Sequence, residues 1–170
     1  NVSIISDTTV VATVTVGSGS GTIAVDPTTG LTYVGNRTSK SVSVISATQL
    51  LGTVPVSAAM SSLDVDPATG YAYVTLYPSN TLAILSGTQL VKKVAVGAYP
   101  WRVMVNRASG QVYVANRSSS SVSVLDGLNV VQTVAVGGAP QALTRDSQTG
   151  FVYVANLAGQ SLSIIDEVPG

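Results

Sequence analysis

The sequence predicts an all-β fold in which one small antiparallel sheet is repeated about four times. Three observations lead to this prediction. A phrase of twelve residues returns every forty residues, as VDPTTGLTYVGN at 25–36, VDPATGYAYVTL at 65–76, VNRASGQVYVAN at 105–116 and RDSQTGFVYVAN at 145–156. The segments between the turn signals are short, rich in Val, Ile and Tyr, and mostly alternating, which is the pattern of strands. No window has apolar residues at helical spacing over three turns, so essentially no helix is expected.

Each repeat contains four strand segments, which lie at 22–26, 31–36, 41–45 and 50–57 in the first complete copy. Between the first and second segments, an Asp or Asn side chain can bond the backbone ahead of it, and a Gly such as Gly30 can adopt the left-handed conformation that closes a tight hairpin. Four antiparallel strands per repeat predict one blade of a β-propeller. Neighbouring blades bury Val and Ile on both faces, and each such side chain contributes about 1.5–3 kcal/mol.

A family resemblance rests on these same segments. DPTTGLTYVGN, DPATGYAYVTL and QVYVAN, each followed by strands like SVSVI and TVAVG, resemble the YVTN family of β-propeller repeats from archaeal and bacterial surface-layer and secreted proteins. The resemblance covers almost the whole chain and implies a propeller fold at an extracellular or cell-surface location in a prokaryote. The shared residues are hairpin and core residues, so the resemblance implies no particular activity. Propellers of this family are commonly seven-bladed, whereas this chain has only a little over four repeats.

The number of repeats leads to a prediction about ring closure. We expect one propeller domain over 1–170, with repeats at about 18–57, 58–97 and 98–137 and a last blade shared between 138–170 and 1–17. In this arrangement the strand around 10–16 pairs with the last three strands and closes a four-bladed ring, for which a monomer is favoured. One copy of the third strand is then surplus. The alternative is an arc of a larger ring, completed by further sequence or by a second chain in an oligomer.

Composition excludes several classes of function. Charged residues make up 9% of the chain and eight basic residues balance eight acidic ones, so no net field attracts nucleic acid. The sequence has no Cys and no His, which removes thiolate metal sites, disulfides and the commonest general base. Asp26, Asp66 and Asp146 lack the spacing of a calcium loop, so no metal and no cofactor is expected. No apolar run is long enough to span a membrane.

The candidate binding residues lie in loops that differ most between repeats. These loops join the fourth strand to the next first strand and the second strand to the third, and we expect both kinds on one rim. The third repeat has GAYPWR there, and the candidate residues are Tyr99, Trp101, Arg102, Tyr77, Asn80, Arg37 and Arg117, with Lys40 nearby. Exposed Trp, Tyr and Arg suit a sugar ring or a partner's side chains. The alternatives are that Trp101 fills space in a narrow ring or against a blade, and that the others are ordinary solvated loop residues.

A few residues depart from the repeat pattern. Arg145 stands where the other three repeats have Val, so its guanidinium needs a partner or an exit to solvent. Asp64 is the comparable acidic departure, and a bond between the two is one hypothesis. Asn1, Asn36 and Asn116 each begin a glycosylation sequon, although capping of a loop is a simpler role for the last two.

The predicted function is a non-catalytic interaction module, extracellular or on the cell surface, with a protein or a glycan as its partner. The sequence has no G-x-S-x-G elbow, no Ser-His-Asp set and no phosphate loop, and it has a single Glu, so the chain is not expected to be an enzyme. A purely structural repeat scaffold, natural, excised or engineered, is the alternative. A lactonase-like enzyme is a third hypothesis.

Overall fold

The structure is a computed structural model that describes residues 1–166, and these residues form seventeen strands and one short 3₁₀ turn. The elements are β1 (Val2–Ser6), β2 (Thr9–Val14), β3 (Ser20–Val25), β4 (Leu31–Asn36), β5 (Ser41–Ser46), β6 (Gln49–Pro55), β7 (Leu63–Asp66), β8 (Tyr71–Leu76), η1 (Tyr77–Ser79), β9 (Thr81–Ser86), β10 (Gln89–Ala95), β11 (Pro100–Val105), β12 (Val112–Asn116), β13 (Ser121–Asp126), β14 (Asn129–Ala135), β15 (Pro140–Arg145), β16 (Val152–Asn156) and β17 (Ser161–Ile165). The all-β prediction is confirmed.

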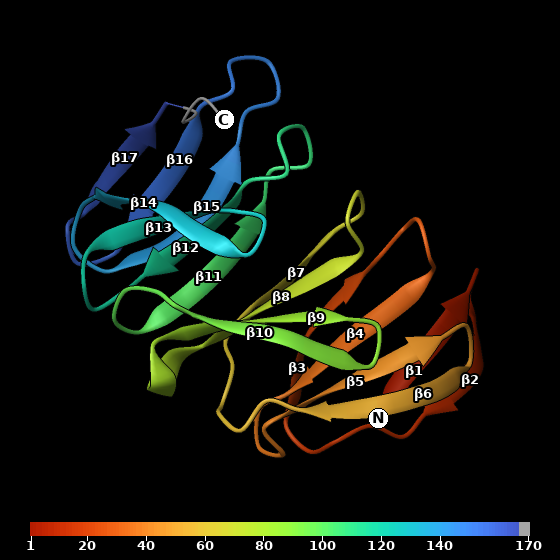
Figure 1. Cartoon of the computed structure of the whole chain (residues 1–170). Coiled ribbons are helices and arrows are strands. Elements are labelled where there is room, and N and C mark those ends of the chain that lie inside the picture. Colours follow the sequence, from red (N-terminus) through yellow and green to blue (C-terminus); the bar gives the residue numbers. More distant parts are fainter. Residues whose placement is uncertain (167–170) are drawn as a thin grey trace.

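The strands form five antiparallel sheets in chain order. Three sheets have four strands each, β3 to β6, β7 to β10 and β11 to β14, and each strand pairs with its neighbour in the chain. The last sheet has three strands, β15 to β17, and the first has two, β1 and β2. Figure 1 shows the sheets following one another in chain order, like successive blades.

The repeated Asp-Pro-Thr-Thr-Gly phrase closes the hairpin between the first and second strands of a sheet. In the first copy, Asp26 accepts the backbone N–H of Thr28 at 2.9 Å and the hydroxyl of Thr29 at 2.6 Å, and Gly30 adopts φ +72°. Burial opposes ionisation of Asp26, but the hydrogen bonds from Thr29 and Thr28 outweigh it and lower the pKa of the carboxyl. Equivalent contacts recur at Asp66 and Asp146, and Asn106 accepts the matching backbone N–H while its Nδ2 donates to the hydroxyl of Ser109. The predicted hairpin chemistry is therefore confirmed.

The core lies between successive sheets. Val42 and Val44 of β5 pack in one buried cluster with Leu63 and Val65 of β7, and similar clusters follow between the later sheets. Tyr33 is fully buried, and its hydroxyl accepts the backbone N–H of Gly87 in the next sheet at 3.0 Å. Each interface thus buries the branched side chains that the alternation predicted.

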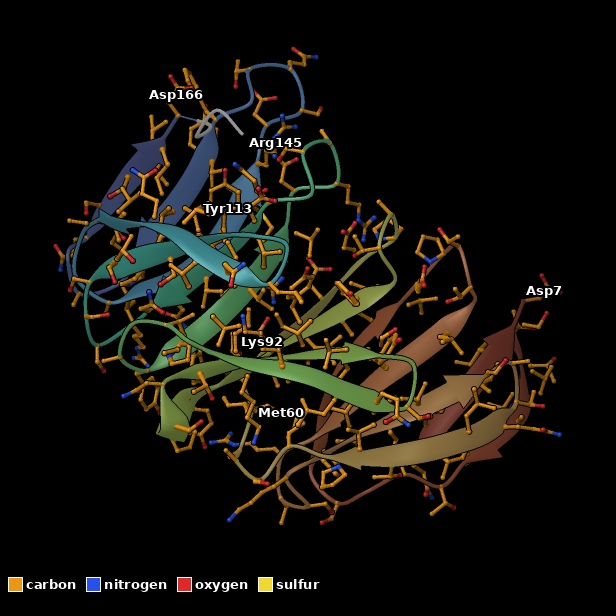
Figure 2. The ribbon with its side chains drawn as sticks, in the orientation of Figure 1. Asp7, Met60, Lys92, Tyr113, Arg145 and Asp166 are labelled. Carbon is orange, nitrogen blue, oxygen red and sulfur yellow. The ribbon has the colours of Figure 1, made fainter. Side chains whose placement is uncertain are left out.

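Asp64 has a structural role at one of these interfaces. One of its carboxylate oxygens accepts the N–H of Val105 on β11 at 2.8 Å, and the other accepts the N–H of Val65 at 2.9 Å. The structure does not support the hypothesis of a bond between Asp64 and Arg145, because the partners of Asp64 are these two backbone N–H groups. Arg145 ends β15 and lies beside Asp146 at the edge of the molecule (Figure 2).

The predicted closure of a four-bladed ring is wrong. Within residues 1–166, β2 pairs only with β1 and β17 pairs only with β16, so the shared last blade does not form. The first and last sheets lie at opposite ends of the molecule in Figure 1. A tight turn joins β1 directly to β2, so their pairing costs less chain entropy than the predicted pairing of β2 with the distant last strands. Val14 of this hairpin also packs against Val34 and Ile45 of the next sheet, which holds β2 in place.

The two end sheets expose side chains that the interior sheets bury. Ile84 of β9 is 0% exposed, whereas Ile164 at the same repeat position of β17 is 58% exposed. At the other end, Ile23 of β3 is 55% exposed, whereas its counterpart Leu63 of β7 is 7% exposed. The interior faces are covered by a neighbouring sheet and these faces are not. The structure is therefore an arc of blades that is open at both ends, which is the alternative considered for the sequence.

Candidate functional site

The two kinds of variable loop lie together on one rim, as predicted. The backbone N–H of Arg37 donates to the carbonyl of Gly19 at 2.9 Å, and the N–H of Arg117 donates to that of Tyr99 at 2.9 Å, so in these repeats the link between sheets binds the link within a sheet. We call this edge the arginine rim. It comprises 17–21, 57–61, 97–102 and 137–141 with 37–40, 77–80, 117–120 and 157–160.

Three aromatic side chains form a compact triangle on the arginine rim. The ring centroids of Tyr77 and Tyr99 are 4.9 Å apart, those of Tyr99 and Trp101 are 5.9 Å apart, and those of Tyr77 and Trp101 are 6.3 Å apart. Tyr99 and Trp101 are stacked with their planes at 11° to each other. All three side chains are partly exposed. The triangle joins the second and third complete sheets, since Tyr77 follows β8 and Trp101 lies in β11.

Two arginines extend this triangle on different rings. Arg37, which follows β4, donates from Nε at 3.2 Å and from Nη2 at 2.8 Å to the hydroxyl of Tyr77. The Cζ of Arg117 lies 5.4 Å from the ring centroid of Trp101, which is within the range of a cation–π contact. The cluster Arg37, Tyr77, Tyr99, Trp101 and Arg117 thus spans three sheets. We call these five residues the arginine–aromatic cluster.

The backbone at Tyr99 is held in an unusual conformation. Tyr99 has φ +57°, in the left-handed region that bulky residues rarely adopt. The equivalent residue in the first repeat is Gly19, which has φ +70°. Asn80 also has a positive φ, 53°, and its Oδ1 accepts the N–H of Tyr99 at 3.0 Å. Ala139, at the same position of the fourth repeat, has φ +54°, so the left-handed conformation belongs to this link in three copies, and Tyr99 adopts it with a bulky side chain.

Two hollows flank Trp101. The larger, of about 810 Å³, is lined by Trp101 and Arg102, by residues of β15 such as Gln141, and by Leu157 and Gln160 of the last sheet. The smaller, of about 200 Å³, is lined by Trp101, Arg37 and small residues of the first two complete sheets. Trp101 and Ser61 contribute to both. The indole therefore stands between two concave surfaces, each with an arginine on its wall.

The structure brings most of the predicted residues together. Arg37, Tyr77, Tyr99, Trp101 and Arg117 form the cluster. The side-chain oxygen of Asn80 accepts the backbone N–H of Tyr99, and Arg102 is exposed on the wall of the larger hollow. Trp101 does not plug a narrow ring, because the chain forms no ring. Sequence reasoning did not single out Ser61, Gln141 and Gln160, although all three lie in the variable loops, and the signal available for them was only their position.

The sequons at Asn36 and Asn116 are explained by structure. Both side chains are fully buried, and each Nδ2 donates at 2.9 Å to a serine of the adjacent strand, Ser43 and Ser123 respectively. A buried amide cannot be reached by a glycosylating enzyme. Both residues thus have a structural role, but it is a bond across the strand pair and not the predicted cap of a loop.

Comparison with solved structures identifies the architecture. The chain is similar to hydrazine synthase from Kuenenia stuttgartiensis, with a TM-score of 0.80 and 19% identity over 89% of this chain and 47% of that one. It is also similar to a functionally unknown protein from Desulfotomaculum acetoxidans, with a TM-score of 0.77 and 16% identity over 93% of this chain and 58% of that one. The chain has a β-propeller fold. Virginiamycin B lyase from Staphylococcus aureus is a further propeller neighbour, with a TM-score of 0.69 and 12% identity over 88% of this chain and 56% of that one.

The same comparisons limit what the propeller fold says about function. The chain spans about half the length of these neighbours. At such identities the likeness concerns the fold alone, and a propeller carries many unrelated activities. No protein-family model and no curated protein sequence matches the chain, so YVTN membership stays a prediction. Within the described part of the chain, no helix is long and apolar enough to span a bilayer.

Proposed function

We propose that this chain is a non-catalytic interaction module that binds a carbohydrate on the arginine rim. The observation that carries the proposal is the arginine–aromatic cluster, in which three partly exposed rings lie within 6.3 Å of one another. Tyr and Trp offer apolar surface and a polar group on the same side chain, and Tyr, Trp and Arg dominate binding hot spots. Gln141, Gln160 and Ser61 beside the indole add neutral hydrogen-bonding groups of the kind that sugar hydroxyls require.

Two sequence features favour binding over catalysis. The chain has no His and no Cys, and the eight basic residues are arginines and lysines, which carry their charge at neutral pH. Within residues 1–166, the side chains of the arginine–aromatic cluster bond and pack against one another, and none of them pairs with a carboxylate. Asp26 and its counterparts are engaged in closing hairpins.

The proposal includes a location outside the cell. The resemblance to YVTN repeats of surface-layer and secreted prokaryotic proteins supports it, together with a low content of charged side chains, 9%. A carbohydrate ligand on the cell surface or in the surroundings is consistent with such a location.

A glycan array tests the proposal. We expect the wild-type chain to give a reproducible signal on a subset of glycans and Trp101→Ala to lose it. Phe151→Ala is the matched control, because Phe151 is a partly exposed aromatic residue far along the strands from Trp101. The control variant is expected to keep the signal. If the wild type binds no glycan, or if Trp101→Ala binds as well as the wild type, the proposal is wrong.

A second candidate function is a structural repeat unit. It is favoured by the exposed apolar faces of the end sheets, where Ile23 and Ile164 are 55% and 58% exposed. In that case the chain contributes blades to a larger propeller, and the array stays silent for the wild type and for both variants. The cluster then fills space between blades without a ligand.

A further inference from the structure

Charges are separated between the two rims of the arc, although the net charge is zero. The arginine rim carries Arg37, Lys40, Arg102 and Arg117 and no carboxylate. The opposite rim, which we call the aspartate rim, carries Asp7, Asp26, Asp66, Asp126, Asp146 and Asp166 in its hairpins and strand ends, together with Arg107 and Arg145, so carboxylates outnumber arginines there by six to two. In Figure 2, Asp166 and Arg145 lie at the top of the molecule and Asp7 lies at its right side, whereas Met60 of the arginine rim lies below the centre.

The separation is long enough to matter at physiological salt. The strands that join the rims have four to seven residues, and at about 3.3 Å per residue a strand of six spans about 20 Å. The screening length is about 8 Å under these conditions. The carboxylates of the aspartate rim therefore do not neutralise the arginine rim, which presents a local positive potential despite the balanced composition.

The guanidinium groups on this rim have donors to spare. Arg37 uses two of its five N–H groups on the Tyr77 hydroxyl, which leaves three. The side chains of Arg102 and Arg117 make no hydrogen bond and no ion pair within residues 1–166. Packing against Tyr77 and Trp101 orders the Arg37 and Arg117 side chains before a ligand arrives, so less side-chain entropy is lost on binding. Ordered guanidinium groups with free N–H edges suit carboxylate and sulfate groups.

From these observations we infer that the ligand of the arginine rim is an acidic polysaccharide, with uronic-acid carboxylates bound by Arg37 and Arg117. The inference rests on the proposed carbohydrate-binding function and adds the charge of the ligand. Sugar rings contact the exposed parts of Tyr99 and Trp101, and the amides of Gln141 and Gln160 bind neutral hydroxyls. An acidic peptide shares the anionic groups but lacks the hydroxyl-bearing rings that the aromatic side chains and the amides of the larger hollow would contact.

Calorimetric titration with three defined polymers tests the inference. The probes are polygalacturonate, its fully methyl-esterified form, and poly-L-glutamate of similar length. We expect the wild-type chain to bind polygalacturonate, with an affinity that falls as salt is raised, and to bind the other two at least tenfold more weakly. Arg37→Ala and Arg117→Ala are each expected to weaken binding about tenfold to a hundredfold, the range for a lost charge-assisted hydrogen bond.

Matched controls separate a direct effect from a change of fold. Arg107→Ala removes an arginine from an exposed hairpin of the aspartate rim and is expected to bind like the wild type. Arg117→Lys keeps the charge and loses the planar fork, so its affinity is expected between those of the wild type and Arg117→Ala. Circular dichroism spectra that match the wild type confirm that each variant folds.

Each outcome decides between the two levels of the proposal. Equal binding of the methyl ester overturns the acidic ligand while leaving a carbohydrate function intact. Stronger binding of poly-L-glutamate overturns it in favour of an acidic protein segment. Unchanged affinity in Arg37→Ala and Arg117→Ala removes these residues from the site. A wild type that binds neutral glycans in a Trp101-dependent manner but not polygalacturonate contradicts this inference alone, whereas a wild type that binds no carbohydrate contradicts the proposed function as well.

Discussion

Ile84 and Ile164 occupy the same repeat position, so the change of each to Ala compares an interior sheet with an end sheet. Ile84 is 0% exposed, and Ile84→Ala should cost about 2–5 kcal/mol of unfolding free energy, because it removes buried methyl groups and leaves a cavity. Ile164 is 58% exposed, so about two-fifths of the 1.5–3 kcal/mol available from full burial is at stake, or about 0.6–1.2 kcal/mol, with no cavity. The melting temperature should then fall by about 4–20 °C for the first variant and about 1–5 °C for the second.

Thermal and urea unfolding of the two variants measure this difference. The scans are run over a range of protein concentrations, because association of the end faces would cover Ile164 and raise its cost as concentration rises. At low concentration we expect Ile84→Ala to lower the unfolding free energy by at least about 1 kcal/mol more than Ile164→Ala does. If both variants lose equal stability at every concentration, Ile164 is covered within one chain, and the open arc is refuted in favour of a closed ring.

Three further predictions concern single residues. Gly97→Ala should destabilise the chain by about 1–3 kcal/mol, measured by urea unfolding, because a Cβ there would lie 2.6 Å from Cγ of the buried Asn116. The lowered pKa of Asp26 means that its contribution to stability is present above about pH 4 and is lost as pH falls through its folded pKa. Asp26→Asn, which copies Asn106 of the third repeat, should therefore reduce the loss of unfolding free energy at acid pH. An unchanged loss at acid pH would contradict this. Burial raises the pKa of Tyr73 to about 12, so the contribution of this side chain to stability is present below about pH 10 and is lost as pH rises through about 12. Tyr73→Phe should therefore lose less unfolding free energy at alkaline pH than the wild type. Equal loss in both proteins would count against this prediction.

The strands and hairpins were predictable because their causes are local. A β-branched alternation specifies a strand, and Asp26 and Gly30 specify the turn that follows within five residues. Ring closure was not predictable in this way. It depends on the angle between neighbouring sheets and on the choice of β1 or β17 as the partner of β2. Residues 1–5 and 161–165 are both third-strand copies, so the sequence of neither strand excludes the wrong pairing.

The meeting of the site residues was predictable from the repeat, whereas their detailed contacts were not. Arg37, Tyr77 and Arg117 follow second strands and Trp101 opens a first strand, so the repeat alone puts them on one rim. The stacking of Tyr99 on Trp101 depends on the positive φ of Tyr99, and no residue-level preference predicts that conformation for Tyr. The separation of charge between rims was readable from the sequence once the strand order was known. Asp64 was recognised as unusual, but its partner on β11 is a backbone N–H. Almost every residue has such a group, so the sequence does not mark which one Asp64 binds.

The central claim is that the arginine–aromatic cluster binds an acidic carbohydrate, and an NMR titration with a short galacturonate oligomer tests it most directly. Trp101 is the only tryptophan, so its indole N–H gives a single signal of known origin. The account predicts that this signal and the Nε–H signals of Arg37 and Arg117 shift together and saturate at one affinity. Unchanged signals at these three residues, with or without shifts on the aspartate rim, would contradict it.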